Sequence, residues 1–354
     1  MMFFSLLLVA TAIHPALPDV PYRQPQLAAA HGIVAMTFGA GSSIYFASSK
    51  DQGRTFSAPV KVAETGALAL GRHRGPRTLI LKDSILVSAV VAEKVATGPH
   101  AHGLPENGNL IVWRSADGGR SWKQISVVND VVGATREGLH STAVAPDGSI
   151  FAVWLDQRTP GMKLYGARSR DGGVTWAKNV QVYGSPDGAI CSCCHPSMTI
   201  DAKGRIWVMW RNVIDGFRDM YVSHSDDGIH FSAAAKQGSG AWKINACPMD
   251  GGGFVVEDGK VTSAWRRESE IYLSEPGSPE KQLGPGKDVT LVKTSRGSFV
   301  AWTRDGGVVA RAPKASDTQV LAPAGGFVTL AALPDGAVLA AWEAQGSIET
   351  KRID

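Results

Sequence analysis

The sequence is poor in charge, and it has no long basic, acidic or helix-forming run. Lys, Arg, Asp and Glu make up 19% of the 354 residues, and the net charge is only +4. Without a block of Lys and Arg, a nucleic-acid-binding surface is disfavoured. Beyond the first dozen residues no apolar stretch is long enough to span a bilayer, so we expect no membrane span. No segment of useful length shows the 3.6-residue period of a helix.

Glycine and proline, in contrast, are abundant. The chain contains 40 Gly and 19 Pro, a composition typical of many short strands joined by turns. A chain of this length is normally divided into several domains, unless it is built from repeats. The composition therefore favours an all-β fold and directs attention to internal repeats.

One short sequence motif occurs four times, at a spacing of about fifty residues, which indicates a repeat architecture. Each copy has a Ser, an Asp two residues later, one or two Gly and a final Phe or Trp. The Asp carboxylate accepts backbone N–H bonds in a tight turn, and Gly supplies a positive φ. We therefore predict a structural role for the four Asp residues, which are Asp51, Asp117, Asp171 and Asp227.

This motif resembles the Asp box of sialidases and of other propellers built from bacterial neuraminidase repeats. The four copies occupy residues 49–56, 115–122, 169–176 and 225–231. The resemblance implies a β-propeller, and it concerns architecture rather than chemistry.

A second repeat predicts the number of blades. A turn, usually with Gly, is followed about six residues later by a large apolar residue in an apolar strand, which describes a hairpin. Four antiparallel strands repeated radially form a propeller, and seven units of about 47 residues suit this chain. Sialidase relatives have six blades, so six is the alternative. The seven hairpins begin near Tyr22, Pro76, His140, Pro196, Pro248, Asp288 and Phe327.

The two ends of the chain have separate predicted roles. Residues 1–12 form an apolar segment that ends in Ala10-Thr11-Ala12, which is similar to a signal-peptide cleavage site. We therefore expect export to the periplasm or the extracellular space, with residues 13–354 as a single propeller domain. Either the extreme N-terminal segment or the strand at 347–352 would close the ring.

The topology of a propeller predicts where a site lies. Turns between strands one and two and between strands three and four share one face, which carries the Asp boxes. The opposite face, here called the top face, carries the connections between blades and the loops between strands two and three. All four Cys and five of the nine His map to it, namely Cys191, Cys193, Cys194, Cys247, His73, His100, His102, His140 and His195.

These thiol and imidazole groups favour a transition-metal site. Copper, especially Cu(I), suits such donors best, and zinc is the next choice. Cys191, Cys193 and Cys194 are so close in sequence that we expect only two of them to bind one ion, together with Cys247 and one or more His. Redox chemistry would be possible at such a site. An exported protein with an even number of Cys also suits disulfides or a redox-active thiol pair, so these alternatives stay open.

The segment Tyr22-Arg23-Gln24-Pro25 is similar to the first-strand motif of sialidases, and this similarity implies that Arg23 clamps a substrate carboxylate. Sialidases also use an acid/base Asp and a Tyr nucleophile. The short loop at residues 39–43 has no carboxylate, and the inner strands of the late blades have no Tyr. We therefore do not expect hydrolysis of sialosides.

Other charged residues of the top face suit a small polar or anionic ligand or a glycan. Those we predict to bind it, besides Arg23, are Arg74, Arg77, Glu137, Arg211 and Arg266. The leading interpretation is an exported propeller with a Cys/His metal site. A sialidase-like hydrolase or glycan-binding protein is the alternative, and a disulfide-stapled interaction scaffold is a third.

Overall fold

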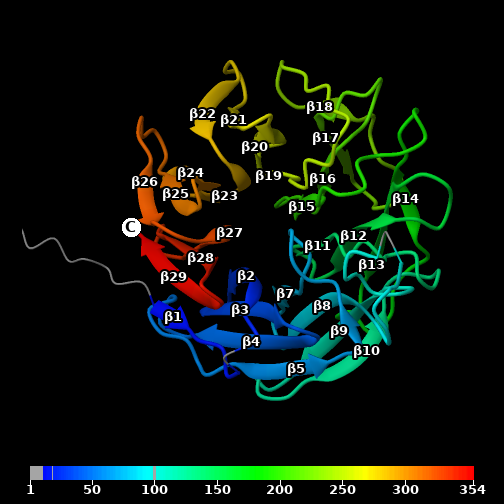
Figure 1. The fold of residues 1–354 in the computed structure, drawn as a ribbon, viewed down its shortest axis with the longest axis vertical. Coiled ribbons are helices and arrows are strands. Elements are labelled where there is room, and N and C mark those ends of the chain that lie inside the picture. Colours follow the sequence, from blue (N-terminus) through cyan, green and yellow to red (C-terminus); the bar gives the residue numbers. More distant parts are fainter. Residues whose placement is uncertain (1–10, 18, 99–100) are drawn as a thin grey trace, which may run out of the picture.

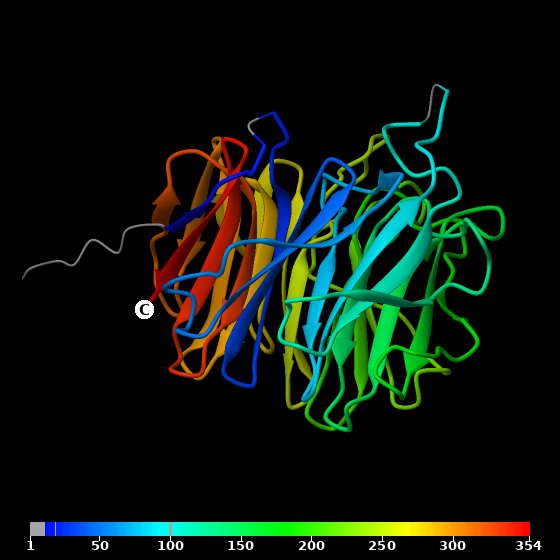
Figure 2. The ribbon, with the colours of Figure 1, turned by 90° about the horizontal axis from the view of Figure 1, so that it is seen from below.

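The chain forms a ring of seven β-sheets around a central axis (Figure 1). The computed structural model describes residues 11–17, 19–98 and 101–354, and within them no helix occurs. Each sheet contains four antiparallel strands in the order of the chain, apart from the last sheet and one short extra strand in the second. Seen from the side in Figure 2, the strands run from one face of the ring to the other. The prediction of an all-β propeller with seven blades is confirmed, and the alternative of six is wrong.

The strands of the first four blades are listed here from the axis outward. Blade 1 contains β2 (Arg23–Ala30), β3 (Ile33–Ala40), β4 (Ser43–Ser49) and β5 (Val60–Glu64). Blade 2 contains β7 (Arg77–Ile80), β8 (Ile85–Ala92), β9 (Asn109–Ser115) and β10 (Lys123–Val127), with the short β6 (Ala67–Leu68) also paired to β8. Blade 3 contains β11 (His140–Val144), β12 (Ile150–Asp156), β13 (Lys163–Ser169) and β14 (Val180–Tyr183). Blade 4 contains β15 (Ser197–Ile200), β16 (Ile206–Arg211), β17 (Met220–Ser225) and β18 (Ala235–Lys236).

The last three blades lack the Asp box but keep the same order. Blade 5 contains β19 (Gly253–Glu257), β20 (Lys260–Arg267), β21 (Glu270–Ser274) and β22 (Lys281–Pro285). Blade 6 contains β23 (Lys287–Thr294), β24 (Gly297–Arg304), β25 (Gly307–Arg311) and β26 (Gln319–Ala322). Blade 7 contains β27 (Gly326–Ala332), β28 (Val338–Ala344), β29 (Ser347–Ile353) and the N-terminal β1 (Thr11–Ile13).

Both ends of the chain close the ring. The C-terminal β29 is the third strand of blade 7, and β1 pairs antiparallel with it as the fourth, with Ile13 opposite Ile348. The two predicted ways of closure therefore operate together. Of the predicted signal segment, residues 1–10 lie outside the described residues, and Thr11 and Ala12 belong to β1. Among the described residues, no helix is long and apolar enough to cross a membrane.

The core lies between adjacent blades and is built on the second strands. Trp154, Trp210, Trp302 and Trp342 stand at the predicted place near the end of these strands, and all four are fully buried. Truncating a buried aromatic of this kind typically costs about 3–5 kcal/mol, so these residues make a large contribution to blade packing.

The Asp boxes join neighbouring blades. In the second copy, Ser115 Oγ accepts the N–H of Gly119 at 2.8 Å and donates to Asp117 Oδ1 at 2.7 Å. Gly119 has a φ of 91°, and a Cβ there would lie 2.1 Å from the Phe46 ring of the preceding blade. Hydrogen bonds from the side chain and N–H of Ser121 hold the pKa of Asp117 well below its usual range. The boxes lie between third and fourth strands, as predicted, and their role is structural.

Candidate functional site

The predicted metal ligands fall into two groups at the top-face ends of the inner strands. The first group, here called the cysteine cluster, consists of Cys191, Cys193 and Cys194. The second contains His73, His140 and His195, which line a cavity on the propeller axis. The sequence suggested one mixed site, and the fold separates sulfur from imidazole.

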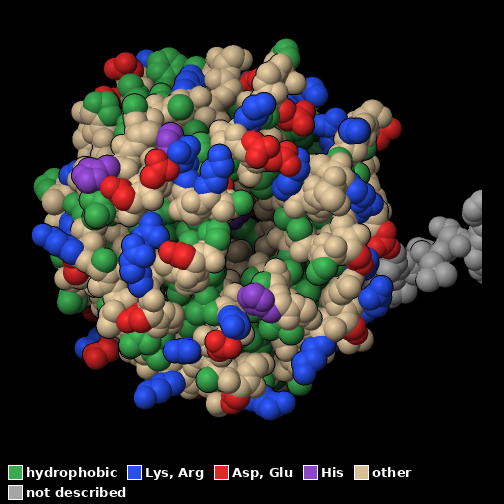
Figure 3. All heavy atoms as spheres, turned by 180° about the vertical axis from the view of Figure 1, so that it is seen from behind, with side chains coloured by type: hydrophobic (Ala, Val, Ile, Leu, Met, Phe, Trp, Pro, Cys, Tyr) green, Lys and Arg blue, Asp and Glu red, His purple; other side chains and the backbone are tan. Residues whose placement is uncertain are grey.

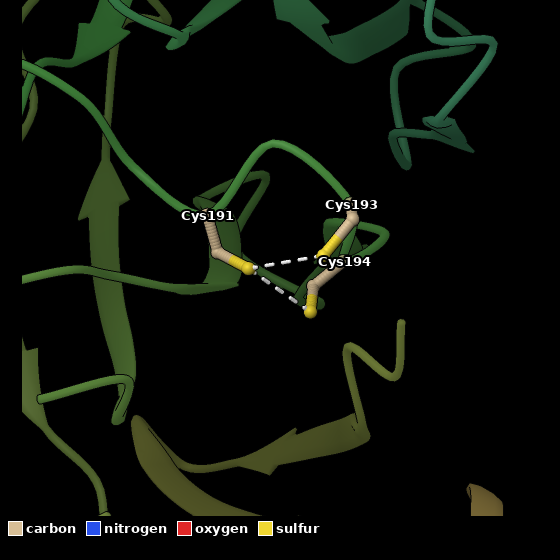
Figure 4. A group of neighbouring side chains, drawn as sticks. All are labelled: Cys191, Cys193 and Cys194. Atoms are coloured by element: carbon tan, nitrogen blue, oxygen red, sulfur yellow. Dashed lines mark hydrogen bonds between the residues drawn. The ribbon is translucent and has the colours of Figure 1, made fainter. Parts of the chain in front are cut away.

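The cysteine cluster lies in the turn that leads into β15 (Figure 4). The Sγ atom of Cys191 is 3.5 Å from that of Cys193 and 3.2 Å from that of Cys194. All three sulfur atoms lie within 4.8 Å of one another, and all three residues are buried. The sequence predicted that only two of these cysteines would bind one ion, and the turn brings all three sulfur atoms together.

The charge of the cluster is unevenly distributed. Arg218 Nη1 donates to the Sγ of Cys191 at 3.2 Å. Hydrogen bonds with the side chains of Cys193 and Cys194, together with the positive charge of Arg211, lower the pKa of Cys191 strongly. The Cys191 bond and burial raise the pKa of Cys193, and burial raises that of Cys194 to about 12. Cys191 is therefore the thiol of the cluster that loses its proton most readily.

A thioether also belongs to the surroundings of the cluster. Met249, with Val213, packs against the three cysteines, and its backbone has a φ of 58°. Arg72 Nη1 donates to the Sδ of Met249 at 3.3 Å. Cys247, two residues before Met249, is exposed and does not belong to the cluster. No disulfide joins the four cysteines in the described structure.

Arg211 joins blades 4 and 5 near the cluster through hydrogen bonds to backbone carbonyls. Its Nε and Nη2 donate to the carbonyl of Asp250 at 3.1 and 3.0 Å, and Nη1 donates to that of Arg218 at 2.7 Å. A further bond from Nη2 reaches the carbonyl of Arg266 at 2.9 Å. Because its donors are directed to backbone oxygens, this buried guanidinium acts on the cluster through its charge.

The other predicted charged residues are paired in different ways. Arg74 forms an ion pair with Glu137 at 3.0 Å and is buried. Arg23 lies 3.5 Å from Glu343 and stays 40% exposed at its side chain. Arg266 donates through Nε to the carbonyl of Glu268 at 2.6 Å.

The axial cavity has a volume of about 250 Å³, and the inner strands of all seven blades contribute to its walls. Figure 3 shows the ring hollowed at its centre, seen from behind the view of Figure 1. The cavity walls include Arg77 and Asp288 besides the three His residues.

His73 and Asp288 form a dyad in this cavity. The Nε2 atom of His73 lies 2.9 Å from Asp288 Oδ1, and the imidazole packs at a tilt against that of His195 with ring centres 4.3 Å apart. Burial opposes ionisation of Asp288, but the hydrogen bond and charge of His73 prevail and lower its pKa. Both dyad residues have left-handed backbones, with φ of 67° and 56°. Such backbone strain in non-glycine residues clusters at functional sites.

His195 and His140 are neutral members of the wall. The N–H of Gly251 is 3.3 Å from Nδ1 of His195, and Nε2 is 3.1 Å from the carbonyl of Gly252, which fits a proton on Nε2. Burial, then the charges of His73 and Arg77, hold the pKa of His195 well below its usual value. Burial and the Arg77 charge lower that of His140 to about 3.

The remaining two predicted ligands lie elsewhere or are not described. His102 lies in the long loop between β8 and β9 and is exposed. His100 lies outside the described residues. Within the described part of the chain, the group that can hold a metal consists of the three cysteines alone, without His, Asp or Glu.

Sequence reasoning missed Asp288 and Arg218 as members of these two groups. Asp288 stands at the same position of its blade as Gln24 and Phe327 do in theirs, since all three have a positive φ at the entry to an inner strand. Alignment of the repeats with one another would have marked this position as one that directs a side chain towards the axis.

The ring of four-stranded blades and the Asp boxes together define a sialidase-like propeller. The chain belongs to the BNR repeat-like domain family, which matches residues 11–187. No curated protein gives a significant match.

Solved structures show the same fold at low sequence identity. An ulvan lyase that represents a polysaccharide lyase family is 12% identical, with a TM-score of 0.60 over 98% of this chain and 96% of that chain. A Hadza microbial sialidase is 15% identical, with a TM-score of 0.58 over 98% and 68%. A Dyadobacter fermentans protein of unknown function is 14% identical, with a TM-score of 0.55 over 97% of each chain.

Proposed function

We propose that this propeller binds a copper ion, as Cu(I), through the thiolates of Cys191, Cys193 and Cys194. The observation that carries the proposal is the meeting of three buried sulfur atoms within 4.8 Å of one another. Soft thiolate ligands favour Cu(I) and zinc among the common metal ions. Structural zinc sites almost always have four ligands, and the described residues supply three here.

The charges around the cluster also favour a monovalent ion. Three thiolates with one Cu(I) carry two negative charges, and the two guanidinium groups of Arg211 and Arg218 carry two positive ones. A buried site needs such compensation, because an unbalanced charge in a low dielectric is costly. Loading would release the protons that Cys193 and Cys194 hold at rest.

Anaerobic titration with Cu(I) against a competing chelator tests the proposal, with metal analysis and a thiol count on the same protein. We expect one copper per chain in the wild type and in Cys247→Ser, which removes the exposed thiol. We expect copper to be lost in Cys191→Ser. A wild-type chain that binds no copper, or a Cys191→Ser chain that keeps it, would contradict the proposal.

A glycan ligand is the second candidate, and a groove beside Arg23 favours it. This groove has a volume of about 520 Å³, and Arg23, Phe327 and Lys287 line it. The related folds include an ulvan lyase bound to an oligosaccharide and several sialidases. We expect glycan binding without sialoside hydrolysis, weakened at least about tenfold in Arg23→Gln. Glycan-array binding and a fluorogenic sialoside assay check this, and equal binding by Arg23→Gln would rule the groove out.

A further inference from the structure

The face of the ring that carries the Asp boxes is hollowed between blades 5 and 6, which are neighbours in Figure 1. This hollow, here called the interblade groove, has a volume of about 510 Å³. Its walls include the turns between strands one and two and between strands three and four of both blades, within residues 257–260, 275–281, 293–298 and 311–314. It therefore lies at the opposite end of the strands from the cysteine cluster and from the histidines of the axial cavity.

Glycines of the Asp boxes pack on the corresponding place of other blades. A Cβ on Gly53, in the box of blade 1, would lie 2.6 Å from Leu339 of blade 7. A Cβ on Gly228, in the box of blade 4, would lie 3.2 Å from Phe151 of blade 3. Leu339 and Phe151 each stand three residues before the buried Trp of their second strand. In blade 5 this position is Thr262, which lines the interblade groove, so the groove is the place that an Asp box of blade 6 would occupy.

Blade 6 has no Asp box to fill this place. Its turn between β25 and β26 contains Ala312 and Pro313, which line the groove and leave it open. Blade 5 lacks the box too, but there Trp207 of blade 4 stands at the position of Thr262 and belongs to one buried cluster with Phe254 of blade 5. A large apolar ring therefore occupies the earlier position, whereas the small Thr262 leaves its own place free.

The rim of the groove is positively charged. Six Lys and Arg residues line it against three Asp and Glu, an excess of three positive charges. Lys281 and Lys293 each pair with a Glu, at 3.2 and 2.9 Å. Lys260 and Lys314 are exposed, and within the described residues no carboxylate oxygen lies within 4.0 Å of their ammonium groups. These two cations are therefore available to an acidic partner.

The floor of the groove is apolar, with Val255, Leu273 and Val300 among its residues. In the blades with an Asp box the same place holds a peptide turn with a carboxylate and an aromatic ring, which are Asp117 and Trp122 in the second copy. We propose that the interblade groove binds an acidic peptide segment of a partner protein, which inserts an apolar or aromatic side chain between the cationic groups. An acidic polysaccharide would match the rim but not the floor, because it has no apolar side chain.

Selection of random peptides displayed on phage, with the full chain as the target, tests this proposal. We expect the selected peptides to contain several Asp or Glu residues and at least one apolar or aromatic residue. Their affinity, measured by fluorescence anisotropy, should fall as salt is added. Polygalacturonate, an acidic polysaccharide, is titrated in parallel. Selection of no peptide, or of peptides without acidic residues, would overturn the proposal, and displacement of the peptides by polygalacturonate would overturn it in favour of a glycan.

Two groove variants place the binding of a selected peptide. Lys260→Glu combined with Lys314→Glu should weaken it roughly tenfold or more, because two charges of the rim are reversed. Thr262→Phe should weaken it to a similar extent without a change of charge, because the ring occupies the groove. Lys203→Glu is the matched control, since Lys203 is exposed in the corresponding turn of blade 4 and does not line the groove.

Equal binding by the wild type and by the chain with both Lys260→Glu and Lys314→Glu would overturn the proposal. Should Thr262→Phe fail to fold, this charge variant decides, since both of its residues are exposed. A loss in Lys203→Glu as large as that in the charge variant would also overturn the proposal, because the peptide would then respond to the charge of the whole face and not to the groove.

Discussion

Cys194 and His195 are adjacent in sequence, and yet they belong to different sites. Cys194 meets Cys191 in the buried cysteine cluster, whereas the ring of His195 packs against that of His73 in the axial cavity. The two residues lie where a turn ends before β15, and the bend at Cys194 sends the two side chains to different sites. A run that mixes Cys and His can therefore supply two chemistries, one of soft sulfur and one of imidazole and guanidinium.

The two sites also differ in how their charges are balanced. In the cysteine cluster, Arg218 donates to the Sγ of Cys191, so the sulfur that ionises most readily faces a positive charge. In the axial cavity, Asp288 is occupied by His73, and the Arg77 guanidinium has only carbonyl partners. Because of this difference, we expect the cysteine cluster to take a cation.

The largest expected effect tests the separation of the two sites at adjacent positions. Cys194→Ser should lower the Cu(I) affinity by at least about a hundredfold, since loss of outer-sphere partners alone costs 10–100-fold. His195→Gln should leave that affinity within about threefold, because both ring nitrogens contact the backbone of blade 5. Competition titration with Cu(I) measures both variants, and a large loss in His195→Gln would show that the two sites are one.

A smaller effect concerns acid stability and the axial cavity. Burial and the Arg77 charge lower the pKa of His140 to about 3 in the folded chain, against 6.5 for the ordinary group. The unfolded chain therefore binds more protons between these values, and stability falls as the pH drops through this window. From pH 7 to pH 5, His140 should remove roughly 2 kcal/mol of the free energy of unfolding.

Urea unfolding of His140→Gln at both pH values checks this effect. In the variant, the number of protons taken up on unfolding between these pH values should be smaller by about one, whatever its absolute stability. His31→Asn is the control, because His31 is exposed and its φ of 50° suits Asn. An unchanged pH dependence in His140→Gln would mean that His140 is protonated in the folded chain.

The fold could be predicted from the sequence in detail, because its signals are local and repeated. The predicted hairpin starts at Tyr22, Pro76 and Pro196 each fall one residue before an observed inner strand. Turn residues and the strand period depend on neighbouring residues only, so four copies of one motif mark where the blades begin and end in the sequence.

The site could be predicted only in part. Topology brought Cys191, Cys193 and Cys194 to the top face together, and the convergence of their sulfurs depends on the path of one turn. Whether a side chain points to the axis or into a blade interface depends on backbone angles at the strand entry, such as the φ of 67° at His73. Pairings between distant blades, such as His73 with Asp288, leave no trace in a single sequence.

The hydrogen bond from Thr350 Oγ1 to the carbonyl of Thr11 connects residues 339 positions apart, between β29 and β1. During synthesis, the amino-terminal strand must therefore wait for nearly the whole polypeptide before its partner emerges. Contacts of such high sequence separation slow folding, and until they form, the edge of β29 is open to pairing with another chain. Sealing of the last blade is thus the step at which a nascent molecule is most exposed to aggregation.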